Sequence, residues 1–148
     1  MNPLIFIVED SAFYRLLLKR LLENNGFQTI AFENPTEAIE QFQDALPKLI
    51  ISDIEMPKMD GFEFYHAIQK LPLNQEIPFL YVSSKDDLKC KELAKTLSTR
   101  EIIKKPICLE LLLGTIHETI LQTSLKETKK AVLKTSIPVT GSPSYIHQ

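Results

Sequence analysis

The chain has little cysteine and no long hydrophobic run, and each absence excludes a class of protein. Its only cysteines, Cys90 and Cys108, lie far apart and lack the spacing of a metal site. Two such residues fit a reducing compartment better than a disulfide framework. The first apolar run covers only Pro3 to Val8, which is too short for a signal-peptide core or a membrane span. We therefore expect a cytoplasmic protein without membrane insertion.

Basic residues are outnumbered over most of the chain. Residues 1–124 contain 13 Lys and Arg against 18 Asp and Glu, whereas residues 125–148 contain 4 against 1. Binding to nucleic acid requires basic patches, so the acidic body argues against direct contact with nucleic acid. The short basic segment at the end is interleaved with threonine, and we interpret it as solvated.

The length and the hydrophobic pattern favour a single α/β domain. The 148 residues, 44% of them hydrophobic, are enough to bury a core. Periodicity and turn signals predict five strands alternating with five helices, which is typical of a doubly wound parallel sheet covered on both faces. We expect this domain over residues 1–124, followed at 125–148 by a helical extension and a flexible tail too short to hide an output module. Strands are expected near residues 3–8, 27–32, 49–53, 79–83 and 101–104, and helices near 11–25, 35–45, 62–70 and 86–97 and from 109 onward.

Local signals mark several helix ends. Ser11 is expected to cap the first helix, and Asn34 precedes a proline at the start of the second. Gly61 follows Asp60 in a turn, where glycine can supply a positive φ. The first helix is expected to turn one apolar face toward the core, formed by Phe13, Leu16, Leu17, Arg20 and Leu21.

Polar residues stand where four of the predicted strands end. Glu9 and Asp10 follow the first strand, and Asp53 ends the third. Ser83 ends the fourth strand, and Lys105 follows the fifth. In open α/β sheets ligands bind beyond the carboxyl ends of the strands, so we expect these side chains at one edge of the sheet.

This set of side chains predicts a phosphoryl-accepting site around a divalent cation. It combines an acidic pair after the first strand, a carboxylate at the end of the third strand, a hydroxyl and an ammonium group. Carboxylate oxygens are ligands that Mg²⁺ prefers. Asp53 could serve as a metal ligand, as a nucleophile, or as both. Lys105 offers a positive charge for phosphoryl oxygens and Ser83 a hydrogen-bond donor, and phosphoryl transfer depends mainly on positioning and charge neutralisation.

These residues also carry a resemblance to a known family. Over about residues 3–122 the chain resembles the receiver domain of two-component response regulators, of the stand-alone type found among chemotaxis regulators. The matching motifs occur in the expected order: Glu9-Asp10, then Asp53-Ile54-Glu55-Met56-Pro57-Lys58-Met59-Asp60-Gly61, then Ser83-Ser84, then Lys105-Pro106.

The resemblance implies a flavodoxin-like receiver fold with five strands and five helices, in which Asp53 is the phosphoacceptor. It implies Mg²⁺ as cofactor, bound directly by Asp10, Asp53 and the backbone carbonyl of Glu55, with Glu9 acting largely through water. It also implies that Ser83 and Lys105 bind the phosphoryl group.

The resemblance further implies the partners. The phosphoryl donor would be a histidine kinase or a histidine phosphotransfer protein, and the signal would pass to a downstream protein whose identity the sequence does not give. A homodimer formed on phosphorylation stays open. The chain would catalyse only its own phosphorylation and dephosphorylation, so we do not class it as an enzyme in the usual sense.

Three features depart from the family pattern. Ile102 stands where an aromatic residue is usual, which puts the usual coupling between hydroxyl shift and aromatic rotation in doubt. Residues 97–101 lack the glycines that the family tends to place there. Glu55 puts a negative side chain beside the phosphoryl site, and we hypothesise that it alters attack by water and hence the lifetime of the phosphorylated state.

Two other functions compete with the phosphorylation switch. The first is a phosphorylation-independent interaction module that keeps the receiver fold, which Ile102 and the missing glycines leave open. The second is a magnesium phosphatase with an aspartyl nucleophile, suggested by the order Asp53-Ile54-Glu55. Against it, such enzymes usually carry the nucleophile on their first motif strand, and no segment here would make a cap over a substrate.

Overall fold

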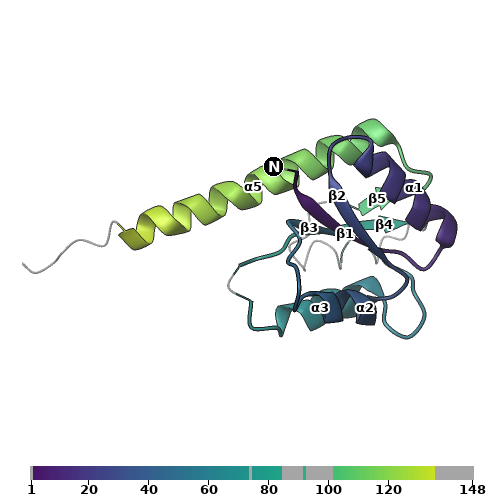
Figure 1. The fold of residues 1–148 in the computed structure, drawn as a ribbon, viewed down its shortest axis with the longest axis horizontal. Coiled ribbons are helices and arrows are strands. Elements are labelled where there is room, and N and C mark those ends of the chain that lie inside the picture. The colour runs from purple at the N-terminus through teal and green to yellow at the C-terminus, as the bar shows by residue number, and fades with distance from the viewer. Residues whose placement is uncertain (1, 74, 85–91, 93–101, 136–148) are drawn as a thin grey trace, which may run out of the picture.

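A computed structural model describes residues 2–73, 75–84, 92 and 102–135. Five parallel strands form one sheet in the order β2-β1-β3-β4-β5 (Figure 1). The strands are β1 (Leu4–Val8), β2 (Gln28–Phe32), β3 (Leu49–Asp53), β4 (Phe79–Ser83) and β5 (Ile102–Lys104). The helices in the described ranges are α1 (Ala12–Glu23), α2 (Pro35–Gln41), α3 (Gly61–Gln69) and α5 (Leu109–Thr135).

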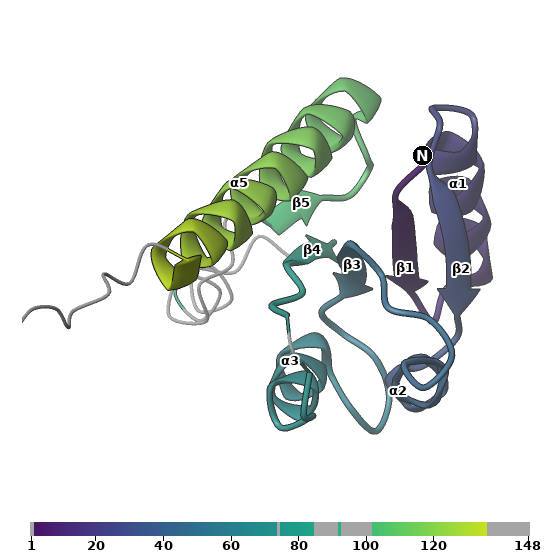
Figure 2. The same ribbon diagram turned by 60° about the vertical axis from the view of Figure 1, so that its left-hand side comes forward.

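Helices cover both faces of the sheet. Figure 2 shows α1 and α5 on one side and α2 and α3 on the other. Because side chains alternate along a strand, Phe6 packs with the α2 and α3 side, whereas Ile5 and Ile7 pack with Leu18 of α1 on the opposite side. This arrangement confirms the predicted doubly wound α/β fold, in which the central strands have no face in water.

The predicted element bounds are close to those of the structure. Ser11 caps α1, its hydroxyl oxygen accepting from the backbone N–H of Tyr14 at 3.4 Å, and Asn34 caps α2 in the same way. Helix α2 ends at Gln41, earlier than expected. The fourth helix predicted at 86–97 lies outside the described residues except for Glu92, as do the segment 97–101 and the tail beyond residue 135.

The predicted apolar face of α1 is wrong. Leu18 and Leu22 are the buried residues of this helix, and Phe13 is 69% exposed. Leu16, also expected to face the core, is exposed as well. Consecutive leucines at 16–18 fill more than one helical face, so periodicity alone could not decide which face packs on the sheet.

The predicted role of Gly61 is also wrong. Gly61 does not have a positive φ; it is the first residue of α3, and Asp60 caps that helix in a capping box with Glu63. The left-handed residue of this loop is Lys58, with a φ of 70°. Gly61 is needed for space, since a Cβ there would lie 2.5 Å from the backbone oxygen of Asp53.

Helix α5 is long and packs on the sheet only over its first half. Leu112, Thr115, Ile116 and Thr119 are buried, and the helix then continues past the edge of the sheet to Thr135 (Figure 1). It runs through residue 124 without interruption, and the division of the chain at 124/125 stays a prediction. None of the helices in the described ranges combines the length and apolar character needed to cross a membrane.

Candidate functional site

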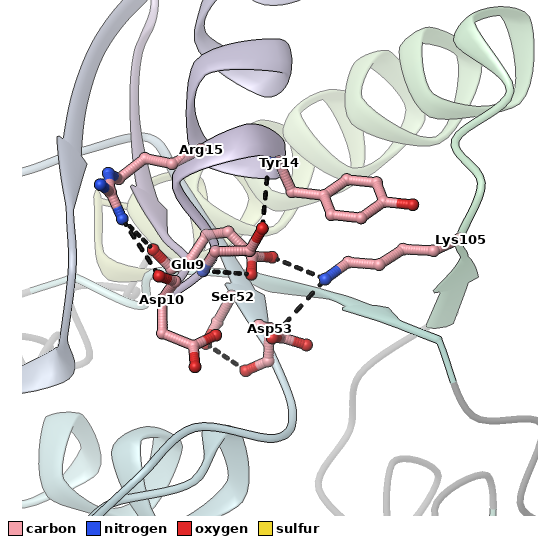
Figure 3. A network of polar contacts seen from close by, with 8 residues as sticks. Glu9, Asp10, Tyr14, Arg15, Ser52, Asp53 and Lys105 are labelled. Atoms are coloured by element: carbon pink, nitrogen blue, oxygen red, sulfur yellow. Dashed lines mark hydrogen bonds and ion pairs between the residues drawn. The ribbon is translucent and has the colours of Figure 1, made fainter.

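The polar residues predicted at the strand ends lie along one edge of the sheet. Val8 of β1 pairs with Ser52 of β3, so the residues that follow each of them, Glu9 and Asp53, stand side by side. Ser83 of β4 pairs with Lys104 of β5, which brings the next residue, Lys105, to the same edge. Figure 3 shows Glu9, Asp10, Asp53 and Lys105 converging there.

Three carboxylates form a compact cluster. One oxygen from each of Glu9, Asp10 and Asp53 lies within 4.8 Å of the others. Glu9 is fully buried and Asp53 is 6% exposed, whereas Asp10 is exposed to solvent. A magnesium ion takes carboxylate oxygens and keeps several waters, so two buried acids beside one that faces water fit its requirements.

Lys105 supplies the positive charge of the cluster. Its Nζ lies 2.9 Å from Oε2 of Glu9 and 3.6 Å from Oδ2 of Asp53, and its side chain is 7% exposed. The backbone N–H of Lys105 donates to the carbonyl of Ser83 at 2.8 Å, which ties the end of β5 to the end of β4. The peptide bond between Lys105 and Pro106 is cis.

One ammonium group does not balance three carboxylates. Burial, and next the negative charge of Glu9, raise the pKa of Asp53 to about 7, although Lys105 opposes this change. Glu9 is fully buried, and its Oε2 is compensated by the ion pair with Lys105. The cluster is therefore short of positive charge, and a divalent cation would correct this shortage.

The turn between β1 and α1 is held by contacts to the acidic pair. The backbone N–H of Ser11 donates to Oε1 of Glu9 at 3.1 Å. Nη1 of Arg15 donates to the backbone carbonyl of Glu9 at 2.9 Å and to that of Asp10 at 3.4 Å. These bonds hold the backbone of the acidic pair and one oxygen of the Glu9 carboxylate.

Sequence reasoning missed both Arg15 and Tyr14. Figure 3 shows the two side chains reaching the cluster from the start of α1. The ring centroid of Tyr14 lies 4.2 Å from Nζ of Lys105. The available signal was their place in the first turn of a helix that begins at the carboxyl edge of the sheet, where side chains can reach a site.

The loop after β3 sets the other side of the site. The hydroxyl of Ser52 donates to the backbone oxygen of Asp53 at 2.8 Å, and the N–H of Gly61 donates to that of Ile54 at 2.8 Å. Glu55, in this loop and two residues after Asp53, is exposed. At the end of β4, Ser83 is buried and the small residue after it, Ser84, is exposed.

A hollow lies beside Asp10, the exposed member of the cluster. Its volume is about 500 Å³, and it lies between the start of α2 and the loop after β3. The lining residues are Asp10, Glu33, Asn34, Thr36, Glu37, Met56, Pro57, Lys58 and Met59. Of the three carboxylates, Asp10 is therefore the one that faces this hollow.

The position that departs from the family pattern lies beside a buried aromatic residue. Ile102 pairs with Tyr81 across β5 and β4, and both pack on the side of the sheet covered by α3. Tyr81 is fully buried, and its hydroxyl donates to the carbonyl of Gly61 at 3.3 Å. Burial also raises the pKa of Tyr81, so this hydroxyl stays protonated and able to donate.

Comparison with known proteins assigns the family. A family model, that of the response regulator receiver domain, matches residues 5–117. The chain belongs to this family. The receiver domain is 29% identical over 117 residues to the chemotaxis protein CheY of Bacillus subtilis (strain 168), covering 78% of this chain and 96% of that one. It is 30% identical over 116 residues to the protein PilH of Pseudomonas aeruginosa, again covering 78% and 96%.

Solved structures agree with this assignment. The receiver domain is similar to the chemotaxis protein CheY4 of Vibrio cholerae, with a TM-score of 0.74 and 27% identity, covering 80% of this chain and 99% of that chain. Together with CheY and PilH, this places the chain among receiver domains of the chemotaxis-regulator type in two-component signalling.

Proposed function

We propose that this receiver domain accepts a phosphoryl group on Asp53 from a phosphohistidine of a kinase or a histidine phosphotransfer protein, in a reaction that requires Mg²⁺. The observation that carries the proposal is the convergence of three carboxylates and Lys105, from the ends of three strands, at one edge of the sheet. A nucleophile, a place for a cation and a charge for the phosphoryl oxygens are thus within reach of one another. Phosphoryl transfer needs these three components more than it needs acid–base groups.

The donor set supports Mg²⁺ in particular. Asp10 and Asp53 would bind it directly together with the backbone carbonyl of Glu55, and Glu9 would act largely through water. When bound, the ion supplies positive charge that lowers the repulsion between Asp53 and an incoming phosphate. Arg15 supports this arrangement, because its bonds to two backbone carbonyls hold the backbone that carries the acidic pair.

The covalent step is a transfer between two nucleophiles. An Oδ of Asp53 attacks the phosphorus, the P–N bond to the donor imidazole breaks, and the imidazole nitrogen keeps the electron pair and takes up a proton. The product is an acyl phosphate on Asp53. Lys105 would shift from Asp53 to a phosphoryl oxygen, and the hydroxyl of Ser83 would donate to another.

The phosphorylated domain would act by protein contacts. The phosphoryl group would shift the population between two conformers of a partner-binding surface, and hydrolysis of the acyl phosphate would reset it. The domain would catalyse only these two reactions on itself. Glu55, which is exposed two residues after Asp53, would influence the attack of water and so the lifetime of the signal.

One observation favours the interaction module as a second candidate. Ile102 is aliphatic, and its neighbour Tyr81 is fully buried and hydrogen-bonded. Neither side chain is therefore suited to the aromatic rotation that is usual in the family. A domain of this kind could bind its partner without responding to phosphate. Membership of the receiver family argues against the magnesium phosphatase reading.

Phosphoryl uptake from labelled acetyl phosphate, with Mg²⁺ or with EDTA, tests the proposal. Label that is incorporated only with Mg²⁺ would support the switch. Equal incorporation in EDTA would contradict the metal requirement, and no incorporation from acetyl phosphate or from a phosphohistidine donor would favour the interaction module.

A further inference from the structure

The aromatic ring of Tyr14 covers the ammonium group of Lys105. The distance from Nζ to the ring centroid is 4.2 Å, which is the geometry of a cation–π contact. The two residues come from opposite ends of the domain, Tyr14 from the first turn of α1 and Lys105 from the residue after β5. Figure 3 shows the ring beside the tip of the lysine, and Glu9 and Asp53 on its other sides.

We propose that Tyr14 is a positioning residue of the phosphoryl site, which holds the Lys105 ammonium beside Asp53 when the carboxylates are engaged by other groups. This inference rests on the proposed function. Lysine is a point charge on a flexible stem, and it can serve a phosphoryl oxygen only if that charge stays near Asp53.

Two ion pairs also hold Lys105. The ion pairs to Glu9 at 2.9 Å and Asp53 at 3.6 Å both use carboxylates of the proposed cation site. A cation and an incoming phosphoryl group would compete for both carboxylates. The ring of Tyr14 attracts an ammonium group through its quadrupole and offers no ligand to a metal, so its hold on Lys105 does not depend on the cation.

Among the residues that the structure describes, nothing around Tyr14 gives the ring another structural role. Tyr14 is half-buried, and it belongs to neither of the two clusters of apolar side chains that pack on the sheet. Its contact with the cap of α1 is made by the backbone N–H and not by the side chain. In the described part of the chain its other ring contact is with Phe13, which is exposed.

This environment supplies matched variants. Tyr14→Phe keeps the ring and removes a hydroxyl that makes no hydrogen bond within the described residues, whereas Tyr14→Leu removes the ring. Phe13→Leu makes the same aromatic-to-leucine change at the adjacent position, which contacts the Tyr14 ring and leaves the contact between that ring and Lys105 in place. Phenylalanine with increasing numbers of fluorine atoms at position 14 keeps the ring and its volume while it weakens the quadrupole.

The first readout is the phosphorylation rate with acetyl phosphate at saturating Mg²⁺. We expect Tyr14→Phe and Phe13→Leu to stay close to wild type and Tyr14→Leu to be slower by about 5- to 30-fold. The affinity for Mg²⁺ should be unchanged in all of them. The fluorinated series should slow stepwise, and a flat series would overturn the proposal even if Tyr14→Leu folds poorly.

The second readout does not require phosphorylation. In NMR spectra of the full chain, the Lys105 side-chain protons nearest the ammonium group should be shifted upfield by the Tyr14 ring, and the shift should persist when Mg²⁺ is added. Loss of the shift on addition of Mg²⁺ would overturn the proposal. Failure of the wild type to take up phosphoryl groups, with the shift intact, would count against the proposed function and not against the contact.

Discussion

Gly61 and Asp53 are packed so closely that no side chain fits between them. A Cβ at position 61 would lie 2.5 Å from the backbone oxygen of Asp53, and it would also be 3.0 Å from the Cα of Ile54. Helix α3 therefore begins directly against the residue that carries the proposed nucleophile. The absence of one methyl group at Gly61 allows the loop after β3 to close in this form.

Gly61→Ala is expected to destabilise the domain by roughly 1–3 kcal/mol, because backbone atoms would have to move to admit the new methyl group. The midpoint of urea unfolding measures this effect. Gly114→Ala is the matched control, since a Cβ at Gly114 in α5 meets nothing within 4 Å. It should stabilise the protein by up to about 1 kcal/mol through helix propensity. Equal effects of the two substitutions would contradict the account of Gly61.

The affinity for Mg²⁺ should depend on pH near neutrality. Burial and the charge of Glu9 raise the pKa of Asp53 to about 7, so below that pH the cation must displace a proton from this carboxyl group. We expect binding to weaken by about tenfold between pH 8 and pH 6, as measured by isothermal titration calorimetry. An affinity that does not change over this range would contradict the raised pKa.

Asp53→Asn should stabilise the protein in the absence of metal ions. The pKa of Asp53 is raised above its ordinary value of 3.8, so its charged form is disfavoured in the folded state. The cost is absent at low pH, grows as pH rises from about 4 to about 7, and is complete at pH 8. In EDTA at pH 8 we expect a gain of roughly 1–4 kcal/mol in the free energy of unfolding.

The control for this gain is Asp44→Asn, which makes the same chemical change at an exposed position. It should alter stability by less than about 0.5 kcal/mol. Urea unfolding of both variants at pH 8 and at pH 4 checks the dependence on pH. A less stable Asp53→Asn protein at pH 8 would show that the charged carboxylate of Asp53 does not destabilise the folded state.

Glu55→Ala should lengthen the life of the phosphorylated state. An exposed carboxylate two residues after Asp53 can accept a hydrogen bond from the attacking water, and its loss should slow hydrolysis several-fold. The decay of purified phosphoprotein in a buffer that contains Mg²⁺ and no EDTA gives the rate of hydrolysis. Glu55→Gln separates charge from size, and unchanged decay in both variants would end the hypothesis.

The sequence predicted most of the sheet and the site because their signals are local. Each apolar run that ends in Glu9, Asp53 or Ser83 specifies a strand and the residue at its carboxyl end. A parallel sheet then brings those ends to one edge, whatever the details of packing. The acidic cluster could be anticipated in this way before any distance was known.

What could not be predicted depends on tertiary packing. Successive leucines left the buried face of α1 open, and only packing against the sheet selects Leu18 and Leu22. The need for glycine at position 61 arises from the approach of α3 to β3, not from φ. The contact between Tyr14 and Lys105 joins residues far apart in the chain, and no local pattern reports it.

Intact mass after incubation with acetyl phosphate and Mg²⁺, measured for the wild type and for Asp53→Asn, decides whether Asp53 is the phosphoacceptor. We expect one phosphoryl adduct on the wild type, which requires Mg²⁺, and none on the Asp53→Asn protein. An adduct of equal yield on Asp53→Asn would contradict the assignment of Asp53 as the phosphoacceptor.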